Sequence, residues 1–246
     1  MLKNQRQKMY KIPFYIASLV SCFVPGKENR HRVRGNINIF LFRIPISRFI
    51  KKTYGERARK IRFVRQVSTN RMTCLVNGRF FVKIFRDVTV TQLNEYKFLL
   101  NHIRPYLHVK IPDIFVAKHI PMYVADKLPG TDLREFDKAQ IIKHERKIRN
   151  GVFQMIDELQ AIPLKSIPNN RRFLTPIQVP RRGPRTYTMT KKSVLAHRDL
   201  NVGNLLLDSK FNLVSVVDWD SIAIFPDPTA DQHNFEHMWD VYKNKH

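Results

Sequence analysis

The sequence has few cysteines and no long apolar run. Its 246 residues include only Cys22 and Cys74, which lie 52 positions apart. Two cysteines at this spacing exclude a disulfide framework and fit a reducing compartment. No stretch reaches the roughly 18–20 apolar residues that a membrane-spanning helix needs. The sequence therefore predicts a chain without a transmembrane segment and without a disulfide scaffold.

Acidic residues are also scarce. The chain has 20 Asp and Glu against 44 Lys and Arg, a formal net charge of +24. This balance indicates an anionic partner, such as a membrane, a nucleic acid or a phosphorylated ligand. Residues 1–66 hold 17 Lys and Arg but only Glu28 and Glu56, and residues 165–192 hold eight Lys and Arg and no acid. Residues 1–66 lack the interleaved aromatic residues of a stacking platform, so a nucleic-acid partner is not expected, although a basic nucleic-acid-binding protein stays an alternative.

The N-terminal segment, residues 1–60, is basic and partly amphipathic. One interpretation is a helix lying on an anionic membrane surface, which would make the protein cytoplasmic and peripheral on the inner face. The other is an ordinary helix packed on the domain. A secretory signal is disfavoured, because Lys11 and Pro13 leave a very short apolar core. The apolar side of the expected helix is formed by Tyr10, Phe14, Leu19 and Phe23.

Strands are predicted after residue 60. Residues 73–85, TCLVNGRFFVKIF, place Asn77-Gly78 between two runs of β-branched and aromatic residues. This dipeptide supplies the positive φ angles of a type I′ turn, so the pattern predicts a hairpin with Lys83 on its second strand. Two further short strands are expected within residues 111–126.

Helices are predicted in the middle of the chain. Thr89 and Gln92 match the capping box of a helix that Pro105 would end. A single long helix is expected over residues 137–162. Residues 163–192 contain five prolines and predict a loop. β-rich and helical segments in this order suggest two lobes.

Residues 196–220, AHRDLNVGNLLLDSKFNLVSVVDWD, gather acidic and amide side chains beside apolar runs. Asn204 and Asp218 would lie on adjacent strand ends, where their hard oxygen atoms suit Mg²⁺. Asp199 on the preceding turn would accept the proton of a substrate hydroxyl, and His197 would brace that turn. The apolar runs predict strands at 205–207 and 213–217.

A metal site and a proton acceptor are parts that phosphoryl transfer needs, and this reaction also needs a cation that contacts the nucleotide phosphates. Lys83 on an interior strand is available for this role. Glu95, twelve residues later in the expected helix, would fix the rotamer of the lysine by pairing with it. An isolated buried Asp is usually structural, but these residues in this order favour a phosphotransferase site.

Two of these segments resemble the protein-kinase-like fold. HRDLNVGN (197–204) resembles its catalytic loop, H-x-D-x-x-x-x-N, and VVDWD (216–220) resembles the segment that carries its second metal-binding Asp. Trp219 stands where eukaryotic protein kinases have Phe-Gly. The better match is the aminoglycoside phosphotransferase and choline kinase family, which FPDPTAD (225–231) also resembles.

The resemblance covers roughly residues 62–235. It implies an α+β, two-lobed protein-kinase-like fold with a small β-rich N-lobe and a reduced helical C-lobe. The expected domains are the N-terminal segment 1–60, an N-lobe at 61–126 that binds nucleotide, and a C-lobe at 127–246. It also implies that Asn70 lies in the nucleotide loop and that Asp231 anchors the catalytic loop.

The implied activity is transfer of the γ-phosphate of ATP, with Mg²⁺, to a hydroxyl of a small molecule or of a saccharide- or lipid-linked acceptor. The saccharide is suggested by residues 12–35, which resemble the openings of bacterial enzymes that build surface polysaccharide. Residues 67–72 lack the glycines that let backbone amides approach phosphates, so a non-catalytic nucleotide-binding scaffold is the main alternative.

Overall fold

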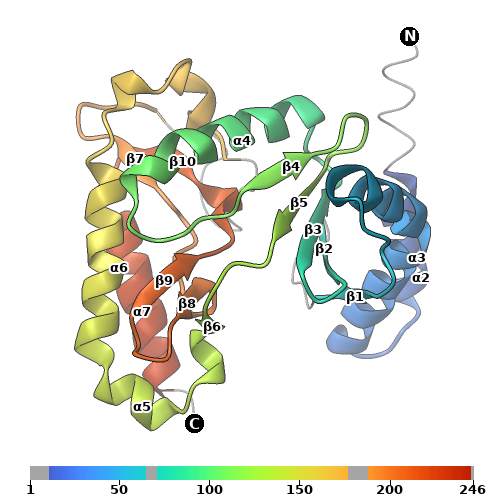
Figure 1. Cartoon of the computed structure of the whole chain (residues 1–246), viewed down its shortest axis with the longest axis horizontal. Helices are drawn as coiled ribbons and strands as arrows, with labels where there is room; N and C mark the ends of the chain where they lie inside the picture. The colour runs from blue at the N-terminus through green and yellow to red at the C-terminus, as the bar shows by residue number, and fades with distance from the viewer. Residues whose placement is uncertain (1–10, 65–70, 177–187, 245–246) are drawn as a thin grey trace. The chain divides into compact units, whose positions relative to one another are not determined.

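The computed structural model describes residues 11–64, 71–176 and 188–244. The chain divides into two compact units. The first contains the residues up to Lys97 together with Asp113–Lys127, and the second contains Phe98–Pro112 and the residues from Leu128 onward. The first unit combines a β-sheet with helices and the second is mainly helical, which confirms the predicted α+β fold class (Figure 1).

The first unit contains one antiparallel sheet with the strand order β1-β2-β3-β5-β4. Side chains of β2 alternate between buried and partly buried positions, as expected for a sheet with one face in a core. Its strands are β1 (Ile61–Phe63), β2 (Arg71–Val76), β3 (Phe80–Phe85), β4 (Ile114–Val116) and β5 (Met122–Asp126).

The turn between β2 and β3 confirms the predicted hairpin. Asn77 has a φ of 55° and Gly78 a φ of 73°, so both central residues occupy the left-handed region. Asn77 also binds the segment before β1. Its Oδ1 accepts hydrogen bonds from the backbone N–H groups of Arg59 at 2.9 Å and Lys60 at 3.2 Å, and its Nδ2 donates to the carbonyl oxygen of Arg57 at 2.9 Å.

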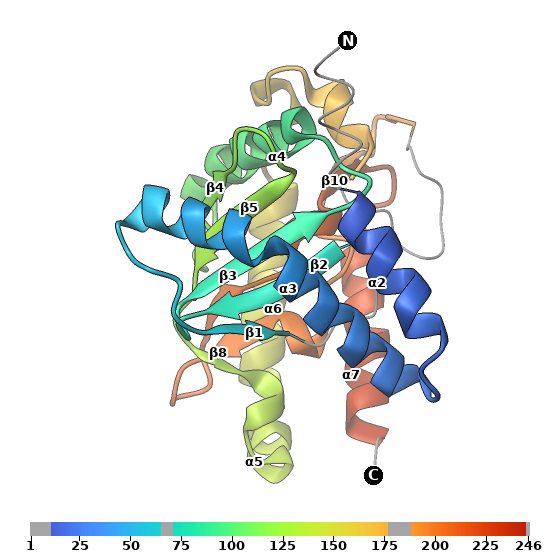
Figure 2. The same cartoon turned by 90° about the vertical axis from the view of Figure 1, so that its right-hand side faces the viewer.

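Two helices, α2 (Ile12–Cys22) and α3 (Lys27–Tyr54), cover a face of this sheet (Figure 2). Phe14 packs against Phe42 with ring centroids 5.6 Å apart, and Phe42 shares one buried cluster with Val82 of β3. The structure therefore contains a helix that packs on the domain, and the membrane-surface interpretation stays a prediction.

The prediction that Phe14, Leu19 and Phe23 share one side of α2 is wrong, and Tyr10, the fourth residue of that predicted side, lies outside the described residues. Phe14 is buried, but Leu19 is 67% exposed and Phe23 is 84% exposed. The error has a physical cause: α2 is apolar on every side, so its periodicity does not tell which side packs. None of the helices in the described part of the chain is both long and apolar enough to cross a membrane.

Helix α4 (Val90–Ile103) confirms the predicted capping box. Gln92 N–H donates to Thr89 Oγ1 at 3.1 Å, and Thr89 N–H donates to Gln92 Oε1 at 2.8 Å. The helix passes into a 3₁₀ turn, η1 (Arg104–Tyr106), at Pro105.

The long helix predicted over 137–162 is wrong as a single element. It is divided into α5 (Lys138–Lys143) and α6 (Glu145–Gln160), with His144 at the break. The His144 ring stacks on Phe211 at 4.2 Å and 12° between planes, a contact with the β8–β9 connection that local sequence does not reveal.

The second unit also contains a three-stranded sheet of order β6-β8-β9 and a two-stranded sheet of β7 and β10. The strands are β6 (Thr131–Asp132), β7 (Val194–Ala196), β8 (Leu205–Leu207), β9 (Leu213–Val216) and β10 (Ala223–Phe225). The last helix is α7 (Ala230–Asn244), and the 3₁₀ turns are η2 (Leu133–Glu135), η3 (Leu164–Ser166), η4 (Asn170–Leu174), η5 (Val202–Asn204) and η6 (Trp219–Ser221).

We expect Asn77→Ala to lower the free energy of unfolding by about 2–3 kcal/mol. The variant loses three hydrogen bonds and places a Cβ-bearing residue without side-chain compensation at positive φ. Asn77→Gly loses the same bonds but relieves the backbone, so it should cost about 1 kcal/mol less. Urea unfolding of both variants checks this. Equal losses would show that the backbone conformation at position 77 contributes nothing.

Candidate functional site

The segment that links β7 to β8, residues 197–204, is anchored by the buried carboxylate of Asp231. Asp231, in the first turn of α7, is 1% exposed. Its Oδ2 accepts the backbone N–H of His197 at 2.5 Å, and its Oδ1 accepts the backbone N–H of Arg198 at 2.8 Å. Hydrogen bonds to a charged acceptor are the strong ones, so this pair fixes where the loop leaves β7. The structure thus places Asp231 where the sequence resemblance implied.

His197 is fully buried and is fixed by partners on both ring nitrogens. Its Nδ1 accepts the backbone N–H of Asp199 at 3.3 Å, and its Nε2 lies 3.2 Å from the carbonyl oxygen of Val217. This network assigns the neutral tautomer with the proton on Nε2. The ring also meets Trp219 edge-on at 4.5 Å. His197 therefore braces the loop against the strand end, and both its nitrogens are used for structure.

The loop then turns sharply at Arg198, which has a φ of 66°. Left-handed backbone is costly for a residue with a side chain, and such positions are enriched at functional sites. The guanidinium of Arg198 lies 3.6 Å from the Phe225 ring centroid, a cation–π contact that offsets part of this cost. The turn leaves the following residue, Asp199, partly exposed.

The main chain of Asp199 is held by two amides. Asn204 Nδ2 donates to its carbonyl oxygen at 2.7 Å, and Asn201 Nδ2 donates to the same oxygen at 3.0 Å. Asn201 Nδ2 also lies 3.3 Å from Asp199 Oδ1. The Asp199 carboxylate is thus presented from a constrained turn, which is how a group that must meet a substrate atom should be held.

Asn204 and Asp218 are brought together by the β8–β9 hairpin. Val217 N–H donates to the carbonyl oxygen of Asn204 at 3.0 Å, so Asp218 follows directly at the neighbouring strand end. Asp218 has a φ of 59°, so it adopts a left-handed backbone conformation, as Arg198 does. The next residue, Trp219, is fully buried and donates its indole N–H to the Val216 carbonyl oxygen at 2.9 Å. The strand end is therefore rigid.

These two side chains fit a magnesium ion. Asn204 uses Nδ2 to hold Asp199, which orients its Oδ1 as the end available to a hard cation, and Asp218 adds a carboxylate. Within the described residues, no three His, Cys, Asp or Glu side chains form a metal-binding cluster. This donor set suits Mg²⁺, because that ion is usually held by one or two protein oxygens and by substrate phosphates.

Lys83 and Glu95 belong to the first unit. Lys83 on β3 lies opposite Tyr123 of β5, and its Nζ is 5.9 Å from the tyrosine ring centroid. Tyr96, next to Glu95 on α4, contacts the same ring at a centroid distance of 6.1 Å. This turn of α4 therefore packs beside the Lys83 segment. The Lys83–Glu95 ion pair itself stays a prediction, and the predicted nucleotide-loop residue Asn70 lies outside the described residues.

Two residues that hold the loop were missed in the sequence. Asn201 Oδ1 accepts the backbone N–H of Gly203 at 2.9 Å, which closes an Asx turn. The Asn-x-Gly spacing was the available signal for it. Asn234 of α7 donates to the Leu200 carbonyl oxygen at 2.7 Å, a contact for which the sequence offers no local signal.

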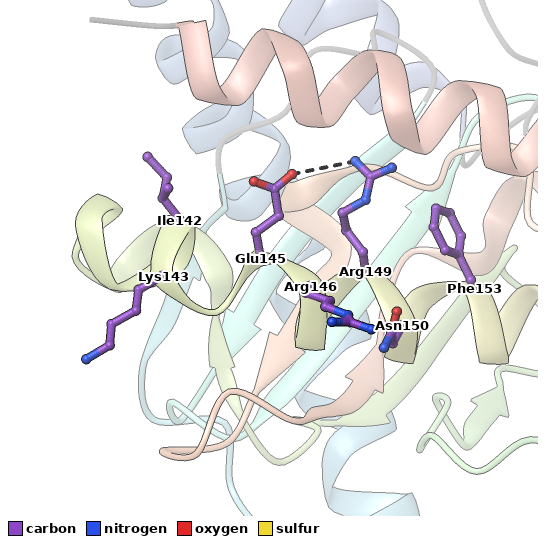
Figure 3. Close-up of a pocket in the computed structure, with 7 residues that line it drawn as sticks. All are labelled: Ile142, Lys143, Glu145, Arg146, Arg149, Asn150 and Phe153. Carbon is purple, nitrogen blue, oxygen red and sulfur yellow. Dashed lines mark ion pairs between the residues drawn. The ribbon is translucent and has the colours of Figure 1, made fainter.

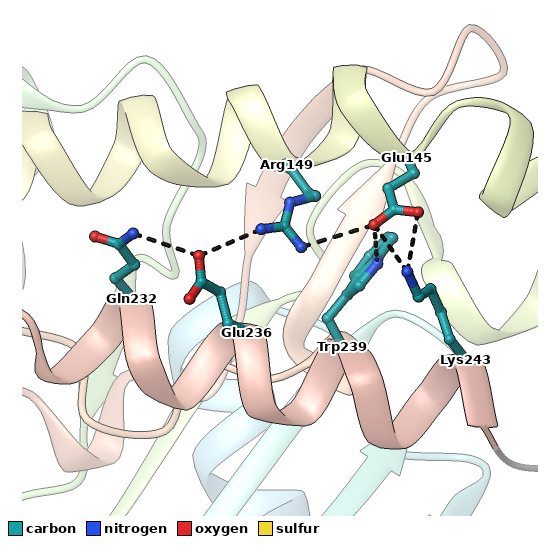
Figure 4. Close-up of polar contacts among 6 residues, drawn as sticks. All are labelled: Glu145, Arg149, Gln232, Glu236, Trp239 and Lys243. Carbon is teal, nitrogen blue, oxygen red and sulfur yellow. Dashed lines mark hydrogen bonds and ion pairs between the residues drawn. The ribbon is translucent and has the colours of Figure 1, made fainter.

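Helix α7, which carries Asp231, is fastened to α6 by a polar network (Figure 4). Glu145 Oε1 accepts the indole N–H of Trp239 at 2.8 Å and lies 3.3 Å from Lys243 Nζ. Arg149 bridges Glu145 at 3.7 Å and Glu236 at 3.3 Å. Glu236, from the stretch HNFEH (233–237), therefore serves the packing of α7 on α6.

One hollow of about 430 Å³ lies along α5 and α6 in the second unit (Figure 3). None of the predicted site residues lines it. Its lining residues are Ile142, Lys143, Glu145, Arg146, Arg149, Asn150 and Phe153.

No family model and no curated protein matches the sequence. The structure is similar to the GDP complex of aminoglycoside 2'-phosphotransferase-IIIa, with a TM-score of 0.57 and 15% identity over 82% of this chain and 83% of that chain. The chain has the fold of the aminoglycoside phosphotransferases. Macrolide 2'-phosphotransferases share this fold: the type I enzyme has a TM-score of 0.56 at 13% identity, over 82% of this chain and 77% of that chain. MphH from Brachybacterium faecium has a TM-score of 0.53 at 15% identity, over 80% of this chain and 81% of that chain.

The predicted fold is therefore confirmed. The resemblance of residues 12–35 to surface-polysaccharide enzymes stays a prediction.

We expect Asp231→Asn to lower the free energy of unfolding by about 2–4 kcal/mol. The amide keeps one acceptor, but its NH₂ group would face a backbone N–H, so one buried donor loses its partner. Asp240→Asn on the exposed side of α7 is the matched control and should change stability by less than about 0.5 kcal/mol. Urea unfolding gives both values, and hydrogen exchange at the His197 and Arg198 amides should accelerate only in Asp231→Asn. Unchanged exchange at these two amides would contradict the anchoring role.

Proposed function

We propose that the protein is a phosphotransferase that moves the γ-phosphate of ATP to a hydroxyl of a small molecule or saccharide. The observation that carries this proposal is the anchored loop, in which Asp231 fixes the 197–204 turn while Asn204 and Asp218 meet at the β8–β9 end. The fold supports it as well. Solved structures of this fold include a complex with GDP and kanamycin and a ternary complex with streptomycin and ATP.

Asp199 is proposed as the group that receives the proton. The acceptor hydroxyl approaches its carboxylate, the proton passes to an Asp199 oxygen, and the hydroxyl oxygen forms a bond to the γ-phosphorus as the bond to the β-phosphate oxygen breaks. The turn supplies the positioning, because Asn201 and Asn204 hold the Asp199 main chain.

Asn204 and Asp218 are proposed to hold Mg²⁺, which neutralises the phosphate charge when it is bound. Lys83 is proposed to contact the nucleotide phosphates, with Glu95 as its partner. His197 acts on the loop alone, since both its ring nitrogens have backbone partners.

A non-catalytic nucleotide-binding scaffold is the second candidate. It is favoured by the absence of glycine from residues 67–72, where backbone amides would otherwise approach phosphate closely. Titration calorimetry with Mg-ATP, followed by ATP consumption over a panel of aminoglycosides, choline and monosaccharides, separates the two. Binding of Mg-ATP with no transfer to any hydroxyl compound would favour the scaffold.

The proposed location is the cytoplasm. Cys22 and Cys74 are both free thiols, one exposed and one buried. A reducing compartment keeps such thiols unoxidised.

Asp199→Asn should lower the rate of acceptor phosphorylation by about 10³-fold or more, since the amide cannot take the proton. Mg-ATP affinity should stay within about threefold of the parent, because Asp199 is not assigned to the metal. The assay is transfer of labelled phosphate, with Asp240→Asn as a control of the same chemical change. An Asp199→Asn variant that transfers phosphate as fast as the parent would refute the role of Asp199.

Asp218→Asn should weaken Mg-ATP binding by at least about tenfold, since the metal loses its one charged protein ligand. Binding of ATP in EDTA should be unchanged, because that complex holds no metal. Calorimetry with and without Mg²⁺ distinguishes the two cases. Equal weakening under both conditions would mean that Asp218 supports the strand end and does not serve the metal.

A further inference from the structure

Helix α2 presents an apolar face to solvent. Its outward side chains recur at helical spacing, and each is between 43% and 84% exposed. They lie opposite the residues that pack inward, Phe14, Ala17 and Ser21. The exposed face consists of Ile12, Tyr15, Ile16, Leu19, Val20 and Phe23.

The composition of α2 is unusual for a helix on a protein surface. Its sequence, IPFYIASLVSC, contains no charged residue. A surface helix normally carries polar residues outward, and one that is apolar on all sides is normally covered. With 11 residues the helix is only about 16 Å long, roughly half of what a membrane span requires. Such a helix can lie within a membrane interface but cannot cross the bilayer.

The face is held in place from behind. Phe14 packs on Phe42 of α3, and the guanidinium of Arg34 donates to Ser21 Oγ at 3.1 and 3.2 Å. At the N-terminal end, the Arg86 guanidinium lies 5.7 Å from the Tyr15 ring centroid. The exposed residues therefore project from a docked helix, and their exposure does not result from a loose end.

The surroundings of this face are strongly basic. Residues 11–54, which include α2 and α3, contain nine Lys and Arg and one acid, Glu28. An apolar face on a helix that packs beside a strongly basic helix matches an anionic lipid surface, where the acyl boundary takes the apolar side chains and the headgroups take the charges. A second copy of the chain would bring the same positive charge against itself. The exposed basic side chains of α3 are Arg30, Arg32, Arg43, Arg48, Lys51 and Lys52.

We propose that the exposed face of α2 docks on a bilayer that contains anionic phospholipid. Its six apolar side chains enter the headgroup–acyl boundary, and the basic residues of the α2–α3 hairpin contact the headgroups. This proposal does not depend on phosphotransfer, and its test uses no catalytic readout.

The test is cosedimentation of the full chain with phosphatidylcholine vesicles that contain or lack phosphatidylglycerol. The parent protein should bind the anionic vesicles, with affinity falling as salt is raised. Leu19→Ser/Phe23→Ser should weaken this binding by roughly tenfold or more, because two exposed apolar groups no longer enter the bilayer. The matched control is Phe98→Ser/Ile142→Ser, which removes two apolar side chains exposed on α4 and α5 and should bind as the parent does.

The basic residues are tested separately. Arg30→Gln/Arg32→Gln should weaken binding by roughly fivefold for each charge, whereas Lys143→Gln/Arg146→Gln on α5 and α6 should have little effect. All variants change exposed residues, and far-UV circular dichroism confirms that each is folded.

Labelling of Cys22 gives a readout that needs no variant. Cys22 lies on α2 and is exposed, whereas Cys74 is buried and burial raises its thiol pKa to about 12. A thiol-reactive environment-sensitive dye should therefore label Cys22 selectively. Its emission should shift to the blue on addition of anionic vesicles.

Three results would overturn the proposal. The first is parent protein that does not bind anionic vesicles, or that binds phosphatidylcholine equally well. The second is a Leu19→Ser/Phe23→Ser variant that binds as tightly as the parent. The third is a parent dimer in sedimentation equilibrium that this variant converts to a monomer while vesicle binding is unchanged, which would assign the face to a second copy.

Discussion

The 197–204 loop depends on one buried carboxylate, Asp231, and on the hydrogen bonds that it accepts from two backbone N–H groups. A carboxylate that is 1% exposed would be costly without partners, and the His197 and Arg198 amides would be costly without an acceptor. The Asp231 carboxylate and the two backbone amides therefore stabilise one another. Because the bonds run to main-chain atoms, they constrain the path of the loop itself. The left-handed turn at Arg198, which presents Asp199, is stable only while this constraint holds.

This constraint is only as rigid as the helix that carries Asp231. Helix α7 buries Phe235 and Trp239 and is tied to α6 through Glu145 and Arg149 (Figure 4). The apolar contacts supply most of the stabilisation, because partly exposed ion pairs contribute little. The polar network instead fixes the rotation of α7, and this rotation determines where the Asp231 carboxylate points.

Sequence reasoning succeeded where the cause was local. Asn77-Gly78 specifies its own turn, and Thr89 with Gln92 specifies its own helix start, because each involves neighbouring residues alone. It failed at His144, where the helix breaks and the ring stacks on Phe211, 67 positions later in the chain. It also failed on α2, since an all-apolar helix has no preferred inner side until a partner is chosen. The Asp231 anchor was predictable only through family resemblance, and the Lys83–Glu95 pair stays a prediction.

The position of Asp231 in the chain has a consequence for the order of folding. A ribosome makes residues 197–220 before it makes α7, so the loop and the β8–β9 end emerge while their anchor does not yet exist. Local strand pairing can form at that stage, but the His197 and Arg198 amides have no buried acceptor. The anchoring of the loop at His197 and Arg198 therefore has to wait until α7 docks on α6. A nascent chain that stalls before this point would contain every residue of the loop but would lack the acceptor that fixes the loop at its start.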